Sequence, residues 1–539
     1  MNFDWLLSIR DGVWLYLAAP LLLLTGLWLT LRFRLPQLTR VGEAIRAVRK
    51  SGDADGEMAA WGATMWNTAG MLGAAGAVGA ATSVALGGAG ALVWIWVWTF
   101  LLAPLRLGEA ILARTSVAGS KGDAPTSLVA RLRSEKNGTA VAAVLAVCLC
   151  IAAFGFGGAA QGEALRTLTN VVVPGATIPI GVAVMVGAAA LVLLGAKRTG
   201  SFGGFLALFC VASIFGVALL SALADPGRAL GALGRTFSDA LEGAPTVSAF
   251  AGALAGEVAR AALVHSLIPT ASTTGFAGSV DAMSRGGTRA QAHAAMIPPF
   301  VFALVTTTLG IAFVATGTYS HTGEDVRPFS DVSVYEVAFE SPSQRLEGDG
   351  LRSGPMRIRG GQLRDSSLVL ATERGIITNP TFTYYGSPAD LAIDLSEGRA
   401  EHLARYQGLA LGEIPLAQTA AIMVHGEMLP SGPTLLTRAM ARGALRKAGS
   451  QLVFAALVML SILGSAIFGL ALMRAAQPFT TRPWLPKLLG VLPALGFGIA
   501  TLMHAPALSW LGEIGCALAS IVVAIVVTMR SDEIWKRIH

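Results

Sequence analysis

The stretch "AGMLGAAGAVGAATSVALGG", residues 69–88, is apolar and uncharged, yet it carries glycine at every third position from Gly70 to Gly79. Glycine weakens a helix, so the segment has two interpretations. Small residues at this spacing let two helices pack closely in lipid. Alternatively, they break the helix and free carbonyls and amides at the bilayer midplane, where an ion and a substrate bind. Spacing alone favours packing but leaves both open.

Composition places this segment in a membrane protein. The chain of 539 residues is 53% hydrophobic and only 14% charged, with a mean hydropathy of +0.61. Its net charge of +7 comes from lysines and arginines in short loops between apolar runs, which is the pattern of cytoplasmic loops and predicts no nucleic-acid partner. The four cysteines lie inside predicted spans, where they are expected to act as small apolar residues.

About eleven windows are apolar and long enough to cross a bilayer as a helix. The predicted spans are residues 14–31, 59–86, 88–112, 138–161, 176–195, 202–223, 246–282, 291–316, 451–473, 486–503 and 506–529. The first follows a polar start without a basic cluster or a small-residue cleavage site, so we interpret it as a retained span and not as a signal peptide. Basic loops after the first and third spans predict an outside N-terminus and a cytoplasmic C-terminus.

One segment departs from this composition, because charge, proline and turn residues return together from residue 318 to about 430. Alternation in "MRIRGGQL", "SLVLATERGIITNPTFTYY" and "DLAIDLSE" predicts β-strands. The sequence therefore predicts a membrane domain in two parts, 1–317 and 431–539, separated by a β-rich extracytoplasmic insertion at 318–430. The basic end of this segment opposes the charge rule for outer loops, although long loops translocate largely regardless of charge.

The seventh span also contains helix-breaking residues. Pro269 and Gly275 flank the hydroxyls of Thr270, Ser272, Thr273 and Thr274, and proline kinks a helix. The two interrupted spans, the second and the seventh, are five spans apart. Two inverted repeats of five helices would give this separation.

Several stretches resemble the sodium:alanine symporters, also called alanine or glycine:cation symporters. They are "GAVGAATSVALGGAGALVWIWVWTFLLAPLRLGEAILA" (76–113), "FGFGGAAQGEAL" (154–165), "GAKRTGSFGGFLALF" (195–209), "MIPPF" (296–300) and "LSILGSAIFG" (460–469). The resemblance implies an all-α polytopic membrane protein whose LeuT-type 5+5 inverted repeat follows one extra helix. It also implies transport of a small neutral amino acid with sodium, across a bacterial inner membrane, without a cofactor.

Residue-by-residue comparison with that family assigns the candidate site. Substrate contacts are expected from Gly73, Ala74, Ala75, Gly76, Gln161, Thr270, Ser272, Thr273 and Thr274, and sodium contacts from Gly73 and Ser461. Several polar groups of the family are missing, among them a hydroxyl and a carboxamide at residues 73–79 and an acid in the seventh span. The substrate carboxylate would then be held by amides at helix N-termini.

Two ionisable residues are candidates for coupling to a proton instead of sodium, because ionisable groups inside spans are functional candidates. Glu163 lies near the outer end of span four and His265 beside the second break. Each also has a structural interpretation, as an interfacial carboxylate and as a buried, hydrogen-bonded histidine. Arg106 and Glu109, three residues apart, are expected to form a structural pair.

Three classes of function follow. The first is a secondary transporter of an alanine-like or glycine-like solute, driven by sodium or protons. The second is a relative without transport, in which the outer domain binds an unidentified ligand or partner protein. The third is an enzyme in the outer segment, which we do not expect because no nucleophile–base constellation or metal-ligand spacing occurs there.

Overall fold

Apolar helices long enough to cross a bilayer dominate the chain. The computed structural model describes residues 4–49, 57–87, 89–115, 127–242, 257–284, 287–316, 318, 323–336, 352–363, 368–372, 375–396, 398–407, 410–414, 421–430 and 432–538. Within these residues nine helices are long and apolar enough to span a membrane, and the bent pair Ala60–Leu72 and Ala74–Ala85 would make a tenth. The chain is therefore a multi-pass membrane protein.

Five spans combine consecutive elements. They are α1 (Asp4–Gly12), η1 (Val13–Ala18) and α2 (Ala19–Arg32); α9 (Thr139–Phe154), η2 (Gly155–Ala160) and α10 (Gln161–Val172); α17 (Thr288–Ala294) and α18 (Ile297–Ala315); α20 (Arg446–Ala476) and η7 (Gln477–Phe479); and α21 (Trp484–Gly490) and α22 (Leu492–Met503). The other apolar helices are α5 (Ala60–Leu72), α6 (Ala74–Gly87), α7 (Ala91–Arg114), α11 (Thr177–Leu194), α12 (Ala196–Leu223) and α23 (Pro506–Met529).

The predicted seventh span, 246–282, begins outside the described residues and continues as α15 (Glu257–Ala271) and α16 (Ala277–Ala282). The count of eleven spans therefore stays a prediction. The remaining helices lie at the two ends of the bundle and are α3 (Pro36–Thr39), α4 (Val41–Arg49), α8 (Leu128–Arg133), α13 (Pro226–Glu242), α19 (Gly432–Arg442) and α24 (Ser531–Ile538).

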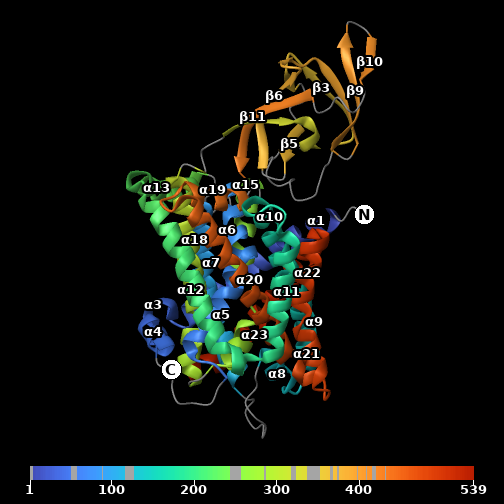
Figure 1. Cartoon of the computed structure of the whole chain (residues 1–539). Helices are drawn as coiled ribbons and strands as arrows, with labels where there is room; N and C mark the ends of the chain where they lie inside the picture. Colours follow the sequence, from blue (N-terminus) through green and yellow to red (C-terminus); the bar gives the residue numbers. More distant parts are fainter. Residues whose placement is uncertain are drawn as a thin grey trace.

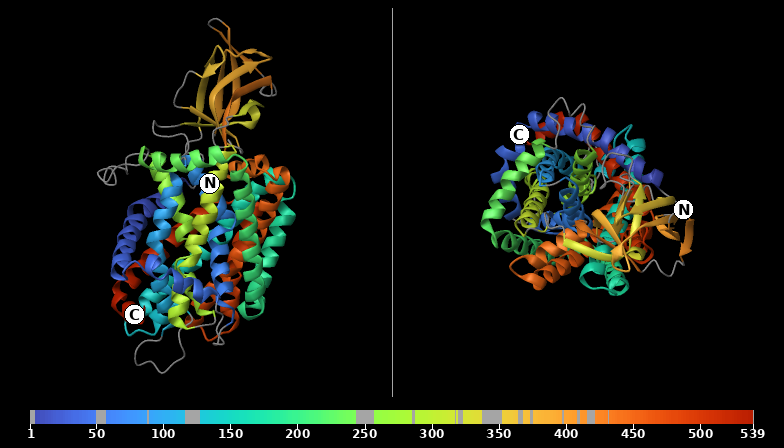
Figure 2. Two further views of the ribbon diagram at one scale, coloured as in Figure 1. Left: turned by 90° about the vertical axis from the view of Figure 1, so that its left-hand side faces the viewer. Right: turned by 90° about the horizontal axis from the view of Figure 1, so that it is seen from above.

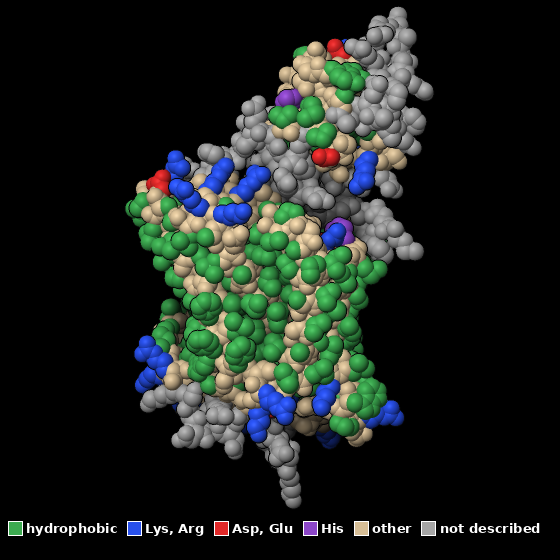
Figure 3. Space-filling model, in the orientation of Figure 1, with side chains coloured by type: hydrophobic (Ala, Val, Ile, Leu, Met, Phe, Trp, Pro, Cys, Tyr) green, Lys and Arg blue, Asp and Glu red, His purple; other side chains and the backbone are tan. Residues whose placement is uncertain are grey.

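Burial in the bundle is arranged for a lipid solvent. Large apolar side chains such as Leu24, Phe202 and Met529 are exposed, whereas glycines meet backbone inside, as where Gly155 lies against Gly512. Figure 3 shows a broad hydrophobic band with lysines and arginines confined to its two edges. Because nothing but lipid tails can cover such a band favourably, it marks the membrane-spanning zone.

A β-sheet stands off one end of the bundle, between α18 and α19 (Figures 1 and 2). Its strands are β1 (Gly323–Pro328), β2 (Ser333–Glu336), β3 (Gly354–Arg359), β4 (Gln362–Leu363), β5 (Leu368–Thr372), β6 (Gly375–Tyr384), β7 (Ser387–Pro388), β8 (Leu391–Ser396), β9 (Arg399–Gln407), β10 (Ala410–Ile414) and β11 (Ile422–Pro430), with η4 (Phe329–Asp331) between the first two. All pairings are antiparallel. Eight strands follow the order β1-β11-β6-β4-β3-β8-β9-β10, while β2 pairs with β5, and β5 and β7 pair with β6.

The strands follow the alternation that the sequence predicted. Met356 and Ile358 of β3 are buried while Arg357 and Arg359 between and after them are exposed. The buried face forms a hydrophobic core that is separate from the core of the helical bundle. Strands in the three quoted stretches are thus confirmed.

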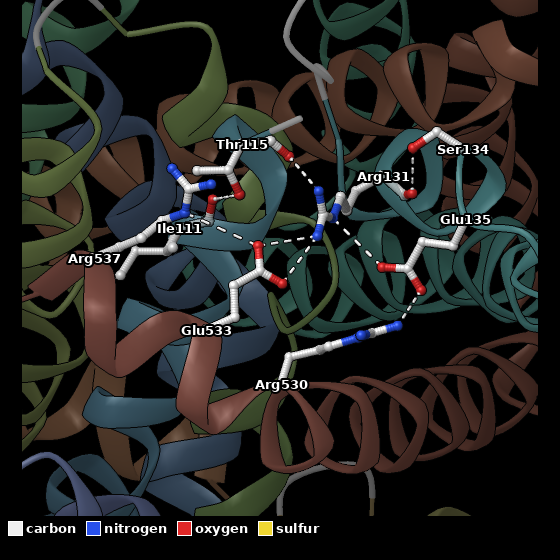
Figure 4. Close-up of polar contacts among 8 residues, drawn as sticks. All are labelled: Ile111, Thr115, Arg131, Ser134, Glu135, Arg530, Glu533 and Arg537. Atoms are coloured by element: carbon white, nitrogen blue, oxygen red, sulfur yellow. Dashed lines mark hydrogen bonds and ion pairs between the residues drawn. The ribbon is translucent and has the colours of Figure 1, made fainter. Parts of the chain in front are cut away.

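The two termini lie at opposite ends of the bundle, with the N-terminus on the side of the sheet (Figure 1). At the other end, ion pairs fasten α24 to α8 (Figure 4). Arg131 Nη2 donates to both carboxylate oxygens of Glu533 at 3.0 Å, and Arg530 donates to Glu135 at 2.6 Å. The C-terminal helix is therefore held to the loop region that follows α7.

Candidate functional site

The first interruption lies between α5 and α6, at Gly73. The two half-helices are bent by 52°, and Gly73 itself leaves the α-helical conformation, with φ −49° and ψ −178°. The amide of Ala74 donates to Ser461 Oγ at 3.2 Å, and the amide of Ala75 donates to Gln161 Oε1 at 3.0 Å. Side chains from α20 and α10 thus bind the first amides of α6, where the helix dipole is positive.

The break also frees carbonyl groups. In a continuous helix the amides of Ala74 and Ala75 would bond to the carbonyls of Gly70 and Met71, four residues earlier. Here both amides donate to side chains, so these two carbonyls lose their helical donors. The C-terminal end of α5 therefore presents oxygens next to the amides of α6, which is the arrangement of a broken transporter helix.

Three of the glycines have distinct physical roles. A Cβ on Gly73 would lie 2.5 Å from Gln161 Oε1, so only glycine lets this side chain reach the break. A Cβ on Gly76 would overlap the Met71 carbonyl. A Cβ on Gly70 would lie 3.1 Å from both Thr273 and Ile467, so this position serves close packing. The segment is therefore both broken and tightly packed.

Gln161 is positioned by a π-helical turn. The turn η2 precedes it, and the carbonyl of Gly157 in that turn accepts a hydrogen bond from Ser465 Oγ at 2.7 Å. Such turns insert a residue and redirect the side chains that follow. Gln161 is fully buried, and its Nε2 has no hydrogen-bond partner among the described residues. A buried donor without an acceptor is costly.

The second interruption lies between α15 and α16. Pro269 is inside α15, and Gly275 takes φ +89°, a left-handed conformation that suits glycine. The Thr270 and Ser272 hydroxyls donate to carbonyls of their own segment, those of Ser266 and Pro269, both at 2.8 Å. They therefore complete local backbone bonding and do not point across to the first break.

Thr273 and Thr274 behave differently from these two hydroxyls. Thr273 Oγ1 accepts a hydrogen bond from Arg106, and its methyl group lies against Gly70 of the first break. Thr274 Oγ1 is buried with no hydrogen-bond partner in the described part of the chain. The second interruption thus touches the first through Thr273.

Aromatic packing joins the two interruptions as well. The rings of Phe276 and Phe468 meet edge to face with centroids 4.8 Å apart. Phe468 also contacts the positions where Gly70 and Gly157 lack a Cβ. Both breaks and the π-helical turn therefore surround one phenylalanine, and Gly73, Gln161 and Ser461 are all buried. The site is closed in this conformation.

A cluster of buried ionisable residues lies beside the second break, and the sequence had indicated only part of it. The predicted pair of Arg106 and Glu109 is present, at 3.9 Å, and Glu109 accepts a hydrogen bond from the amide of Gly278 at 2.7 Å. Asn67 donates to Asp281 Oδ1 at 3.1 Å. Asp281 lies in a predicted span, where an acid is a functional candidate. Its position in the sequence therefore could have identified it as a member of this cluster.

The two predicted coupling residues lie on α10 and α15. Glu163 pairs with His504 across a distance of 2.6 Å, near the surface. His265 is half-buried on α15 and has an interaction partner. Neither takes part in the hydrogen bonds that the amides of Ala74 and Ala75 donate to Ser461 and Gln161.

The chain is similar in sequence to known transporters. Residues 2–341 match the sequence model described as the sodium:alanine symporter family. The chain is 28% identical over 257 residues to the sodium/alanine symporter AgcS of Methanococcus maripaludis, covering 46% of this chain and 56% of that protein. It is 26% identical over 270 residues to the uncharacterized transporter YflA of Bacillus subtilis, 48% of this chain and 55% of that one.

A shorter match links the chain to an uncharacterized transporter of Haemophilus influenzae, with 33% identity over 118 residues, 21% of this chain and 25% of that protein. The chain thus spans about half the length of the first two curated relatives.

Proposed function

Since the chain belongs to the sodium:alanine symporter family, a family of transporters and not of enzymes, we propose that it is a secondary-active transporter of a small neutral amino acid. The substrate class is alanine-like or glycine-like, and the driving ion is a cation, sodium in the first instance. Transport proceeds by alternating access around the closed site at Gly73. A LeuT-type 5+5 repeat after one extra helix is part of this proposal.

The observation that carries the proposal is the state of Gln161. Its Oε1 binds the first turn of α6, while its Nε2 donor is buried without a described acceptor. The carboxylate of an amino acid would supply that acceptor, and the positive end of the α6 dipole would favour its charge. Thr274 Oγ1, also buried and without a described partner, adds a second polar group for the substrate.

The small side chains around the break support a small substrate. Ala74, Ala75 and Gly76 begin α6, and Gly70 faces Thr273 across the interruption. Phe468 closes the apolar side of this space. Such a lining suits a methyl group or a hydrogen as the substrate side chain, because a larger one would need the packed glycine contacts to open.

Sodium requires several oxygen ligands. The carbonyls of Gly70 and Met71 are released from the helix, and Ser461 lies within hydrogen-bond distance of Ala74. The Ser461 hydroxyl donates its hydrogen to Leu457 O at 2.8 Å, so its oxygen keeps lone-pair capacity for a cation. Gly73 and Ser461 remain the proposed sodium contacts, with Glu163 and His265 as the groups that would serve a proton-coupled relative.

The proposed orientation follows the loop charges. The N-terminus and the sheet, at one end of the bundle, would face outward, and the C-terminus at the other end would face the cytoplasm of a bacterial cell. The domain limits 1–317, 318–430 and 431–539 belong to the same proposal, with the middle segment as the outer domain.

One observation favours a second candidate, a relative that no longer transports. The first amides of α6 are already bound by Ser461 and Gln161, so a substrate carboxylate would have to bind Gln161 Nε2 instead of those amides. In this alternative the outer domain binds a ligand or protein, and the membrane part serves as its anchor.

Uptake by the purified full chain in proteoliposomes tests the proposal. Radiolabelled alanine should accumulate with an inward sodium gradient, and choline in place of sodium should remove the accumulation. Gln161→Met, which keeps the length of the side chain but not its hydrogen bonds, should lower uptake at least tenfold. The matched control is Gln362→Met on the exposed strand β4, which should leave uptake unchanged.

Three results would contradict parts of the proposal. Wild-type vesicles that accumulate neither alanine nor glycine under any cation gradient would favour the second candidate. Accumulation that follows a pH gradient and does not depend on sodium would show that the coupling ion is a proton and not sodium. Full uptake by Gln161→Met would remove the role of Gln161.

A further inference from the structure

Three basic residues lie where the loop-charge rule does not expect them, at the end of the bundle that carries the sheet. Arg442 ends α19, and Arg446 and Lys447 begin α20. All three are exposed, and none has a side-chain partner among the described residues. Figure 3 shows lysines and arginines gathered at this edge of the hydrophobic band. We call these three residues the basic turn.

The basic turn is anchored on the end of a membrane span. A Cβ on Gly443 would overlap Ser221 Oγ of α12, and a Cβ on Gly449 would lie 3.2 Å from Val217 of the same helix. Leucines are exposed immediately beside this contact, with Leu220, Leu223 and Leu445 exposed to 47%, 55% and 40%. The cations therefore stand at the boundary where an apolar, lipid-facing surface ends.

The local carboxylate does not neutralise these charges. Asp225, which follows the same end of α12, is paired with Arg228 at 3.2 Å. Among the side chains that the structure describes, no carboxylate is therefore paired with the three cations of the basic turn. Long basic side chains at such a boundary extend their charged ends to the phosphate level of a bilayer.

The backbone of Arg446 adds an independent observation. Its φ is +51°, a left-handed conformation that glycine and asparagine adopt far more easily than arginine. The turn therefore carries a charged side chain at a position whose backbone geometry favours glycine. Backbone strain of this kind clusters at functional sites, so it indicates a role for the Arg446 side chain.

We propose that the basic turn binds the headgroup phosphates of anionic phospholipids in the membrane leaflet on the side of the sheet. The guanidinium groups of Arg442 and Arg446 match phosphate oxygens in geometry and charge, and Lys447 adds a third charge. The exposed leucines contact the acyl chains of the same lipids. Each cation strengthens binding about fivefold at an anionic surface, less at high salt.

The test measures lipid retention by the purified full chain in micelles of equal amounts of phosphatidylglycerol and phosphatidylcholine, using native mass spectrometry. Wild-type protein should retain phosphatidylglycerol preferentially, and a triple variant with Arg442→Gln, Arg446→Gln and Lys447→Gln should lose most of that preference. The matched control replaces three exposed arginines of the sheet with glutamine, Arg357, Arg359 and Arg399, and should retain the lipid as the wild type does.

Arg446→Gly separates binding from folding. Since glycine relieves the left-handed backbone, this variant should keep or raise the melting temperature and still retain about fivefold less phosphatidylglycerol. Equal retention by the triple variant and the wild type would overturn the proposal, as would an equal loss in the control. Displacement of the lipid by millimolar inorganic phosphate would also overturn it, because the site would then bind free anions.

Discussion

The replacement Gly73→Ala tests the geometry of the first break most directly. The new methyl group would lie 2.5 Å from Gln161 Oε1 and 3.0 Å from both Cδ and Nε2, whereas ordinary contacts need about 3.5 Å. The φ of Gly73 is −49°, so the position does not need the left-handed conformation that favours glycine, and the clash with Gln161 is the main cost. Gln161 must then withdraw and release the amide of Ala75.

The magnitude follows from these two effects. Overpacking a filled interior costs about 1–3 kcal/mol, and a buried amide left without an acceptor costs about 1–3 kcal/mol. Partial relaxation makes the sum about 2–4 kcal/mol. We expect a lower melting temperature in detergent and at least tenfold slower alanine uptake in proteoliposomes.

Two further variants make the result specific. Gly216→Ala, inside α12 where an added Cβ meets nothing, should lower neither quantity. Shortening the opposing side chain in the double variant Gly73→Ala with Gln161→Ala should recover part of the stability but none of the uptake. Normal uptake by Gly73→Ala, or a double variant no more stable than Gly73→Ala alone, would refute the reasoning.

Three other predictions concern neighbouring parts of the molecule. Ser461→Ala should raise the sodium concentration for half-maximal uptake roughly tenfold, because one proposed oxygen ligand and the bond to Ala74 are lost. Ser461→Thr, which keeps the hydroxyl, should keep the wild-type sodium concentration. An unchanged sodium dependence in Ser461→Ala would exclude Ser461 from the cation site. Arg131→Ala should lower the free energy of unfolding by about 1–3 kcal/mol, because Glu533 loses both 3.0 Å bonds but can rehydrate. In thermal unfolding, this loss should exceed that of the control Arg133→Ala, whose guanidinium stacks on Phe479 instead. At Glu43, burial alone raises the pKa, but the hydrogen bond from Arg40 and the charges of His293, Arg40 and Arg289 outweigh it, so its pKa lies below the ordinary 4.5. The stability that Glu43 contributes is therefore present above pH 4.5 and lost as the pH falls through the lowered value; the difference in melting temperature between the wild type and Glu43→Gln should persist above that pH and vanish in stronger acid.

Local patterns predicted most of the elements correctly. Apolar runs predicted membrane helices, and alternation in the outer segment predicted strands that the structure contains. Gly73, Pro269 and Gly275 mark the interruptions in both cases, because the loss of helix propensity at glycine and proline acts within one turn of the chain.

The polar partners at the site required the tertiary structure. Ala75 and Gln161 are 86 positions apart in the chain, Asn67 and Asp281 are 214 apart, and Ala74 and Ser461 are 387 apart. The sequence alone marked the positions at which the helices could break, but it left close packing as the alternative. Which side chains reach the freed amides was decided only by helix packing, since contacts between spans depend on how close the glycines let the backbones approach.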